Sequence, residues 1–137
     1  MVFSDGGARG NPGPAAIAFI IQSETGQAVI ARSSYIGVCT NNQAEYRALL
    51  AALEAVAARK TEKVICHLDS ELVVKQLSGE YMVKNKELKQ LWKKVQAMVN
   101  QFKEVKFVNV PRDQSVIQEV DRLVNMTLDT SAGDRKF

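Results

Sequence analysis

A glycine- and proline-rich segment near the amino terminus constrains the fold more than any other stretch: Ser4-Asp5-Gly6-Gly7-Ala8-Arg9-Gly10-Asn11-Pro12-Gly13-Pro14. It lies between two apolar runs, residues 1–3 and residues 15–21. Glycine permits close backbone approach and positive φ, and proline fixes φ in tight turns. The segment therefore predicts a strand, a glycine-lined turn and a second strand, with Asp5 beside the turn. Taken alone, the segment favours an ordinary hairpin whose turn needs glycine over a functional site.

The remaining chain predicts alternating strands and helices in one domain, residues 1–128, followed by a short polar tail, residues 129–137. Strands are expected at residues 1–7, 15–22, 28–38, 64–68 and 105–110, and helices at 42–60, 69–79, 86–102 and 116–128. The first three strands form an antiparallel meander, whereas strands four and five follow helices and should run parallel to strand one. The predicted fold class is α/β, a five-stranded mixed sheet flanked by helices.

Composition argues against several classes of protein. No apolar run is long enough to span a membrane and no signal peptide is visible, which predicts a cytoplasmic protein. Cys39 and Cys66 are too few for a disulfide framework, and a single histidine, His67, is too few for a Cys/His zinc site. The net charge of +3 is uneven, because lysines gather between Lys75 and Lys106. Such a region suits either a solvated helix face or a phosphate backbone.

Two carboxylates lie on helix faces that should be apolar. Glu45 precedes Leu49 by four residues on the apolar stripe of its predicted helix, although Asn42 and Glu45 also resemble a capping box. Asp121 is expected to be embedded in the apolar stripe of the last helix. A lone buried carboxylate is costly unless it is paired or bound to a metal, so an ion pair with lysine or arginine is the structural alternative.

Two further carboxylates, Asp5 and Asp69, each follow an apolar strand. Because their strands should be parallel neighbours, both are expected at the sheet end where ligands bind in α/β folds. An N-cap role is the structural alternative for Asp69. Two carboxylates about 4 Å apart repel by roughly 4 kcal/mol at an effective dielectric of about 20. If all four converge, oxygen-only ligands favour Mg²⁺ or Mn²⁺, and two such ions suit phosphoryl transfer.

Four motifs together resemble the type 1 ribonuclease H family: Asp5-Gly6-Gly7 with Gly10-Asn11-Pro12-Gly13, Thr40-Asn41-Asn42-Gln43-Ala44-Glu45, Leu68-Asp69-Ser70-Glu71, and Asp121-Arg122-Leu123. Their order and spacing match the family over residues 1–128. The resemblance implies a ribonuclease H-like fold and a monomeric endoribonuclease. Such an enzyme hydrolyses the RNA strand of RNA–DNA hybrids with two Mg²⁺ ions, leaving 5′-phosphate and 3′-hydroxyl ends.

The resemblance also implies roles for individual residues. Asp5 would bridge both ions, Glu45 and Asp69 would hold the ion at the leaving 3′ oxygen, and Asp121 would hold the ion that activates water. The implied contacts to the hybrid are Gly10, Asn11, Asn41, Asn42 and Gln43 along the minor groove, Thr40 on a DNA-strand phosphate, and Ser70. Asparagine and glutamine can donate to and accept from the 2′-hydroxyl, which distinguishes RNA from DNA.

The chain departs from the family pattern around its basic region and in the loop before the fourth carboxylate. No basic protrusion follows Gly79, so Lys84, Lys86 and Lys89 are expected to grip the hybrid. The loop is longer than usual and lacks the family's mobile histidine. Arg112 is the candidate to replace that histidine, because guanidinium holds a departing phosphate at all working pH values.

The only histidine, His67, belongs to a predicted strand, and a partly buried ring with one hydrogen bond is its favoured interpretation. Two other functions stay open at this point. A non-catalytic hybrid- or RNA-binding module is disfavoured by four intact carboxylates, which would repel phosphate. Another two-metal nuclease, resembling a resolvase or integrase, is disfavoured by the proposed 2′-hydroxyl readers in residues 40–43.

Overall fold

The structure is a computed structural model that describes residues 1–134, and side chains up to residue 131. In chain order the elements are β1 (Val2–Ala8), β2 (Gly13–Gln22), β3 (Ala28–Cys39), α1 (Asn41–Ala58), β4 (Lys63–Leu68), α2 (Glu71–Leu77), α3 (Lys86–Val99), β5 (Glu104–Asn109) and α4 (Ser115–Asp134). The strands form one sheet in the order β3-β2-β1-β4-β5. The β1–β2 and β2–β3 pairs are antiparallel, and the β1–β4 and β4–β5 pairs are parallel, so the predicted fold class is confirmed.

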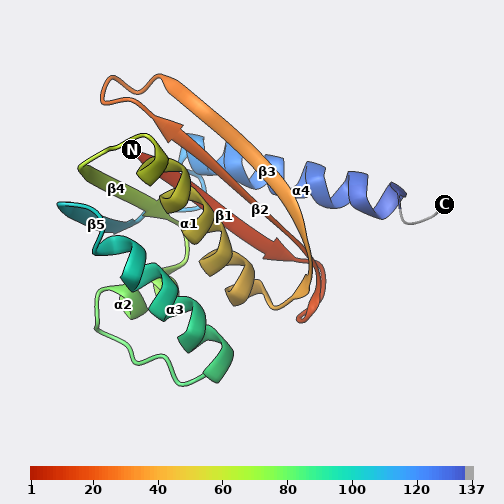
Figure 1. The fold of residues 1–137 in the computed structure, drawn as a ribbon. Helices are drawn as coiled ribbons and strands as arrows, with labels where there is room; N and C mark the ends of the chain where they lie inside the picture. Colours follow the sequence, from red (N-terminus) through yellow and green to blue (C-terminus); the bar gives the residue numbers. More distant parts are fainter. Residues whose placement is uncertain (135–137) are drawn as a thin grey trace.

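Helices pack on both faces of this sheet (Figure 1), with α1 and α3 on one side and α4 on the other. Because side chains alternate along a strand, Val2 joins the apolar cluster under α1, and Phe3 joins the cluster under α4. Asp5, two residues after Phe3, therefore projects from the α4 face of the sheet. Within residues 1–134, no helix has the length and apolarity needed to cross a membrane.

The last helix is longer than the sequence predicts. Instead of ending at Leu128, α4 continues through Asp134, so the expectation of a frayed tail is wrong for residues 129–134. The polar residues after Leu128 led to the prediction of a tail, but polar residues are equally compatible with an exposed helix. Asp129 in this segment forms an ion pair with Arg9. Residues 135–137 of the expected tail lie outside the described part of the chain. The domain boundary at residue 128 stays a prediction.

Gly6 determines how closely α1 approaches β1. A Cβ atom built on Gly6 would lie 2.2 Å from the carbonyl oxygen of Ala44, a separation that no side chain tolerates. Glycine at this position therefore allows the first turn of α1 to rest directly on the strand. The next residue of that turn is Glu45, and the preceding residue of the strand is Asp5, so this contact brings the two carboxylates to the same place.

Candidate active site

Parallel pairing of β1 and β4 places two carboxylates side by side. The register pairs Phe3 with His67, and the same offset places Asp5 beside Asp69, which directly follows the last residue of β4. The predicted convergence of Asp5 and Asp69 at one sheet end is therefore what the structure has. Phe3 also stacks on the His67 ring, with centroids 4.3 Å apart.

Glu45 is the third carboxylate of the group. Its predicted part in a capping box with Asn42 is wrong, because α1 begins earlier: Thr40 is the N-cap, and Gln43 completes the box. Since capping does not use Glu45, its carboxylate extends to the sheet, where ligand oxygens of Asp5, Glu45 and Asp69 lie within 4.8 Å of one another. Asp5 is 8% exposed and Glu45 is 9% exposed.

Asp121 lies at the rim of this group. It is exposed, so the prediction that it is embedded in the apolar stripe of α4 is wrong. The buried stripe consists of Ile117, Val120, Val124 and Leu128, and each step along a helix turns the side chain by roughly 100° away from such a stripe. Asp121 nevertheless lies close enough to help raise the pKa of Asp5, and it lines the same cleft of about 420 Å³.

Burial and mutual repulsion raise the pKa values of these carboxyl groups. Burial, followed by the charges of Asp69, Glu45 and Asp121, raises the pKa of Asp5 to about 8. Burial and the charge of Asp69 raise the pKa of Glu45 to about 7, against a hydrogen bond from Ser70 that lowers it. Burial also raises the pKa of Asp69. The charge of Arg112 opposes these shifts for Glu45 and Asp69 only in part. The donor set, entirely oxygen, is the kind that hard divalent cations prefer.

Arg112 lies close to the carboxylate group but is held loosely. Its Nε atom is 3.8 Å from Asp69 Oδ2, and its side chain is 91% exposed. Its charge opposes the rise in the pKa of Asp69, which burial dominates. An exposed guanidinium at this distance is free to move between the carboxylates and a ligand phosphate.

His67 has the structural role that the sequence predicts. The ring is partly buried, and its Nδ1 atom lies 3.0 Å from the carbonyl oxygen of Val2. Together with the stack on Phe3, this contact fixes the ring between β1 and β4. The interpretation of a partly buried ring with one hydrogen bond is confirmed.

The glycine-lined turn is tied to the start of α1 by two asparagines. Asn11 Oδ1 accepts from the Asn41 backbone N–H at 3.1 Å, and Asn41 Oδ1 accepts from the Ala8 N–H at 3.2 Å. Both side-chain Nδ2 groups are left without a partner within residues 1–134, and both residues are exposed. Asn41 also lines the carboxylate cleft, and Asn11 is tied to it from the turn.

Gln43 differs from these asparagines, because both ends of its amide are used. Its Oε1 accepts from the Thr40 N–H at 2.8 Å, and its Nε2 donates to Glu87 Oε2 at 2.7 Å. Thr40 Oγ1 in turn caps the Gln43 N–H. This arrangement makes Gln43 a link between α1 and α3, and its contact to the minor groove stays a prediction. Asn42, beside it, is half-buried.

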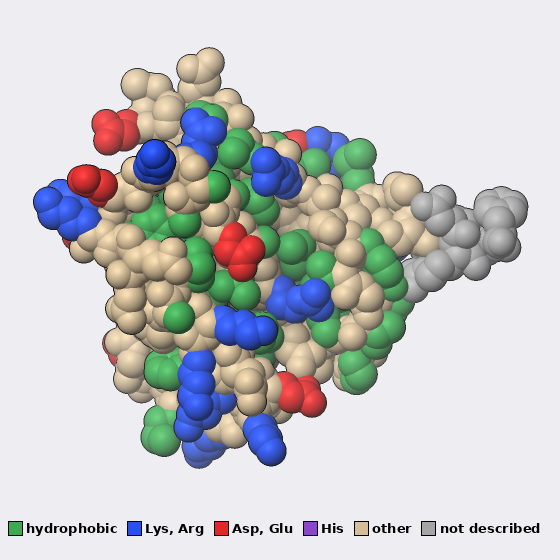
Figure 2. All heavy atoms as spheres, in the orientation of Figure 1, with side chains coloured by type: hydrophobic (Ala, Val, Ile, Leu, Met, Phe, Trp, Pro, Cys, Tyr) green, Lys and Arg blue, Asp and Glu red, His purple; other side chains and the backbone are tan. Residues whose placement is uncertain are grey.

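The basic region continues from this link. Lys84, Lys86 and Lys89 are all exposed at the amino-terminal end of α3 and the segment before it. Figure 2 shows Lys and Arg side chains gathered over this lower part of the molecule. Because Glu87 bonds Gln43, the lysine surface (Lys84, Lys86 and Lys89) is anchored to the helix that supplies Glu45.

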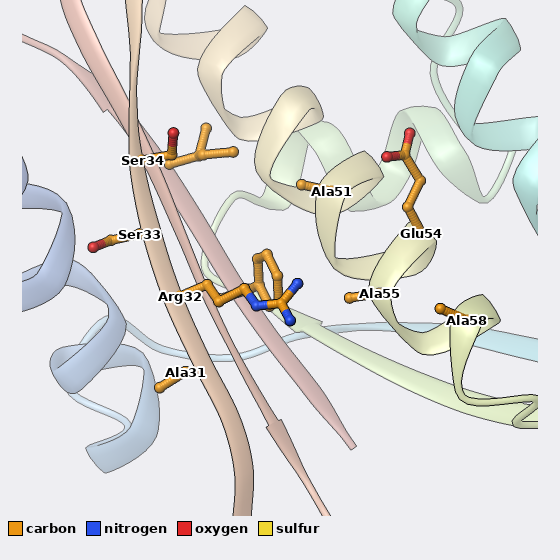
Figure 3. A pocket seen from close by; sticks show the side chains of 10 residues that line it. Ala31, Arg32, Ser33, Ser34, Ala51, Glu54, Ala55 and Ala58 are labelled. Atoms are coloured by element: carbon orange, nitrogen blue, oxygen red, sulfur yellow. The ribbon is translucent and has the colours of Figure 1, made fainter.

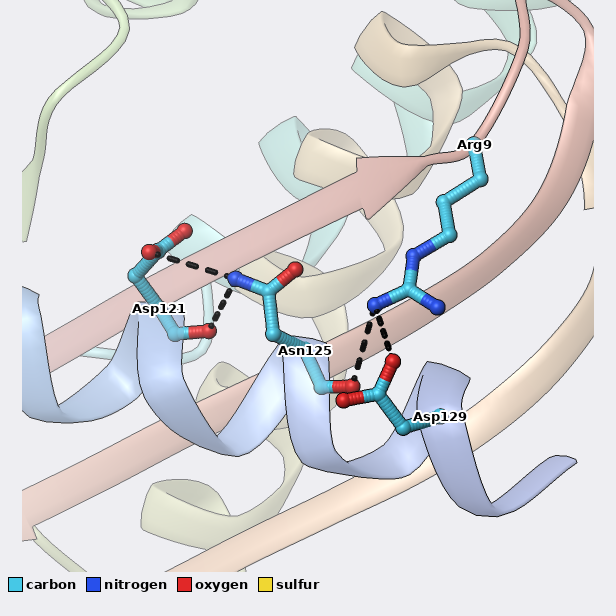
Figure 4. A network of polar contacts seen from close by, with 4 residues as sticks. All are labelled: Arg9, Asp121, Asn125 and Asp129. Atoms are coloured by element: carbon cyan, nitrogen blue, oxygen red, sulfur yellow. Dashed lines mark hydrogen bonds and ion pairs between the residues drawn. The ribbon is translucent and has the colours of Figure 1, made fainter. Parts of the chain in front are cut away.

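Three polar residues at the other side of the cleft were not predicted as functional (Figure 4). Asn125 Nδ2 donates to Asp121 at its carbonyl oxygen, 3.1 Å away, and at Oδ2, 3.3 Å away. Arg9 Nη2 donates to the Asn125 carbonyl oxygen at 3.3 Å and lies 2.6 Å from Asp129 Oδ1. The i, i+4 spacing of Asp121 and Asn125 is a signal the sequence offered, whereas nothing in the sequence indicates the Arg9 contact.

A second hollow of about 740 Å³ lies between β3 and α1, but few polar or charged side chains line it. Figure 3 shows small side chains along both walls, among them Ser33, Ala51 and Ala55. Among the described residues that line it, Arg32 and Glu54 are the charged ones. The carboxylate cleft is smaller, and it is the one in which titratable groups converge.

Comparisons with known proteins agree with this site. Residues 3–127 match the reverse transcriptase-like family. The bifunctional protein Rv2228c of Mycobacterium tuberculosis is 40% identical over 134 residues, which cover 96% of this chain and 36% of that protein. Its N-terminal RNase H domain, solved as a fusion with maltose-binding protein, is 35% identical with a TM-score of 0.91, covering 98% of this chain and 97% of that chain.

Two further solved structures cover nearly the full length of both chains. RNase H1 of Halobacterium salinarum NRC-1 is 36% identical with a TM-score of 0.89, over 94% of this chain and 96% of that chain. LC11-RNase H1 in complex with an RNA/DNA hybrid is 38% identical with a TM-score of 0.89, over 96% and 97%. With the fold, the carboxylate group and these likenesses together, the chain belongs to the ribonuclease H family.

Proposed function

We propose that the chain is an endoribonuclease that hydrolyses the RNA strand of RNA–DNA hybrids and leaves 5′-phosphate and 3′-hydroxyl ends. The observation that carries this proposal is the convergence of the Asp5, Glu45 and Asp69 carboxylates within 4.8 Å. The similar LC11-RNase H1 was solved with an RNA/DNA hybrid, which supports the choice of substrate. A monomeric state and a cytoplasmic location stay predictions.

The carboxylate group fits divalent metal ions. Its donors are all oxygen, and the pKa values of Asp5 and Glu45 are raised first by burial and then by the charges of neighbouring carboxylates. In the proposed site Asp5 would serve two Mg²⁺ positions, Glu45 and Asp69 would complete one of them, and Asp121 would complete the other. Two Mg²⁺ ions held there, or Mn²⁺ in their place, would supply an activated water and stabilise the leaving 3′ oxygen.

Neighbouring side chains prepare these ligands. Ser70 is the N-cap of α2, where its hydroxyl accepts from the Val73 N–H, and the same side chain lowers the pKa of Glu45. Asn125 holds the Asp121 carboxylate from the adjacent helical turn. Arg112, close to Asp69 yet exposed, is placed to hold the departing 5′-phosphate.

Selection of the RNA strand is assigned to the amides of the glycine-lined turn and of the start of α1. Asn11 and Asn41 each have a free Nδ2 donor, and their oxygens are fixed by backbone N–H groups. A deoxyribose strand would leave such donors unpaired, at a cost of roughly 1–3 kcal/mol each. Asn42, Gly10, Thr40 and Ser70 are proposed to extend this surface, whereas Gln43 serves as the link to Glu87.

A cleavage assay on end-labelled RNA–DNA hybrid, duplex RNA and duplex DNA, each with Mg²⁺ or with EDTA, tests the proposal. We expect the RNA strand of the hybrid to be cut only with Mg²⁺, and duplex DNA to stay intact. Comparable rates on both duplexes would favour a resolvase-like nuclease. Hybrid binding without cleavage in either Mg²⁺ or Mn²⁺ would favour a non-catalytic binding module.

A further inference from the structure

We propose that Arg9 binds a phosphate of the RNA strand beside the scissile one. This inference rests on the function proposed above and adds a substrate contact on the α4 side of the cleft. Arg9 immediately follows β1 and lines the same cleft as Asp5, Asp69 and Asp121.

The two cations of the cleft lie at different places along it. Among the described residues that line the cleft, only Arg9 and Arg112 carry a positive charge. Arg112 approaches Asp69, which follows β4, whereas Arg9 reaches α4 at Asn125 and Asp129 (Figure 4). A strand lying across the carboxylates would therefore meet a guanidinium on either side of the reacting phosphate.

The Arg9 guanidinium is fixed and still has donors to offer. Its contacts to the Asn125 carbonyl oxygen and to Asp129 Oδ1 both use Nη2. Guanidinium carries five N–H donors, so the donors on Nε and Nη1 stay without a partner among the side chains that the structure describes, residues 1–131. A guanidinium that is held through one nitrogen and has free donors on two others is suited to phosphate, whose geometry matches the guanidinium fork.

A purely structural role explains this contact less well. The Arg9 and Asp129 side chains are 43% and 68% exposed, and ion pairs this exposed add little to stability. Arg9 is also joined directly to Gly10 and Asn11, the turn proposed to read RNA 2′-hydroxyls. Its position between that turn and Asp121 favours the RNA strand over the DNA strand.

Binding of a fluorescent RNA–DNA hybrid in EDTA, measured by anisotropy over a series of salt concentrations, tests the proposal without cleavage. Arg9→Ala should weaken binding about five- to tenfold and lower the slope of log affinity against log salt by about one. Arg9→Lys should keep the slope because it keeps the charge. Arg59→Ala is the matched control, since this exposed arginine caps the opposite end of α1.

Asp129→Asn distinguishes a role of Arg9 in substrate binding from a role in holding β1 to α4, because it removes the ion pair and keeps the Arg9 charge. Its salt slope should equal that of the wild type. A second test uses a set of hybrids, each with a single RNA phosphate replaced by an uncharged methylphosphonate. At one position the replacement should weaken binding by the wild type but should not weaken binding by Arg9→Ala any further.

An unchanged slope in Arg9→Ala, an equal loss in Asp129→Asn, or coupling to a DNA-strand phosphate instead would overturn the assignment of Arg9. If the wild type cleaves hybrid normally in Mg²⁺ in that case, the proposed function stands and only Arg9 is reassigned. Failure of the wild type to bind or cleave hybrid refutes the proposed function itself.

Discussion

The carboxylate group and the lysine surface face the same proposed substrate but are built in opposite ways. Asp5, Glu45 and Asp69 come from a strand, a helix and the end of a second strand, and the fold forces them together against their own repulsion. Lys84 and Lys89 are exposed on one short stretch of chain, where each is solvated independently. We expect loss of a carboxylate to abolish the reaction, and loss of a lysine to change it by degrees.

The largest effect is expected for Asp5→Asn. Because Asp5 is the ligand proposed to be shared by both ions, kcat should fall by at least about three decades. Single-turnover cleavage of a labelled hybrid measures this loss, and circular dichroism checks that the variant is folded. Retention of most of the activity in Mg²⁺ would show that the reaction centre lies elsewhere.

Arg112→Ala should have the next largest effect. Loss of a guanidinium proposed to hold the departing phosphate should lower kcat at least about tenfold, or roughly 1.4 kcal/mol in barrier. His67→Ala is the matched comparison, and it should keep activity within about fivefold because its ring packs on Phe3 and bonds the Val2 carbonyl. A large loss in His67→Ala beside a silent Arg112→Ala would reverse these two roles.

Stability without metal should depend on pH in a direction set by the raised pKa values. Asp5 and Glu45, with ordinary pKa values of 3.8 and 4.5, reach about 8 and about 7 in the fold. Between these limits the folded chain holds protons that the unfolded chain releases, so the free energy of unfolding falls as pH rises and levels off above about pH 8.

Thermal melts in EDTA from pH 4 to pH 8.5 measure this dependence. Asp5→Asn should melt higher than the wild type at pH 8 and vary less with pH, because it removes one raised pKa and one repelling charge. Added Mg²⁺ should restore most of the lost stability of the wild type. If the melting temperatures of the two proteins changed with pH in the same way, repulsion within the carboxylate group would be contradicted.

The smallest effects are expected on the lysine surface. Lys84→Ala and Lys89→Ala should each raise KM about two- to threefold and leave kcat nearly unchanged, because an exposed phosphate contact adds little on its own. Initial rates at two salt concentrations measure the change. A loss of kcat as large as that of Arg112→Ala would mean that this surface takes part in catalysis.

The sequence predicted the parts of the site that local patterns encode. The end of β4 places Asp69, the strand before the glycine-lined turn places Asp5, and the position of Glu45 on an apolar stripe indicates its burial. The predictions were wrong where a shift of one or two residues decides which side chain is buried or caps a helix. The buried stripe of α4 runs through Val120 instead of Asp121, and the capping box begins at Thr40 instead of Asn42.

Side-chain contacts between segments that are distant in the sequence could not be predicted from the sequence. Arg9 and Asp129 are separated by most of the chain, and neither lies in a periodic pattern that indicates the other. The Gln43–Glu87 bond likewise depends on how α1 packs beside α3. Side-chain partners of this kind follow from tertiary packing, so they appear only once the whole fold is assembled.

The end groups left by cleavage test the central claim most directly, namely that the carboxylate group directs a metal-activated water to the RNA phosphodiester. Hybrid cut by the wild type in Mg²⁺ should carry 5′-phosphate and 3′-hydroxyl ends on RNA alone, and EDTA should stop the reaction. Products with 2′,3′-cyclic phosphate ends, or cleavage that continues in EDTA, would show that the RNA 2′-hydroxyl attacks instead and would contradict this account.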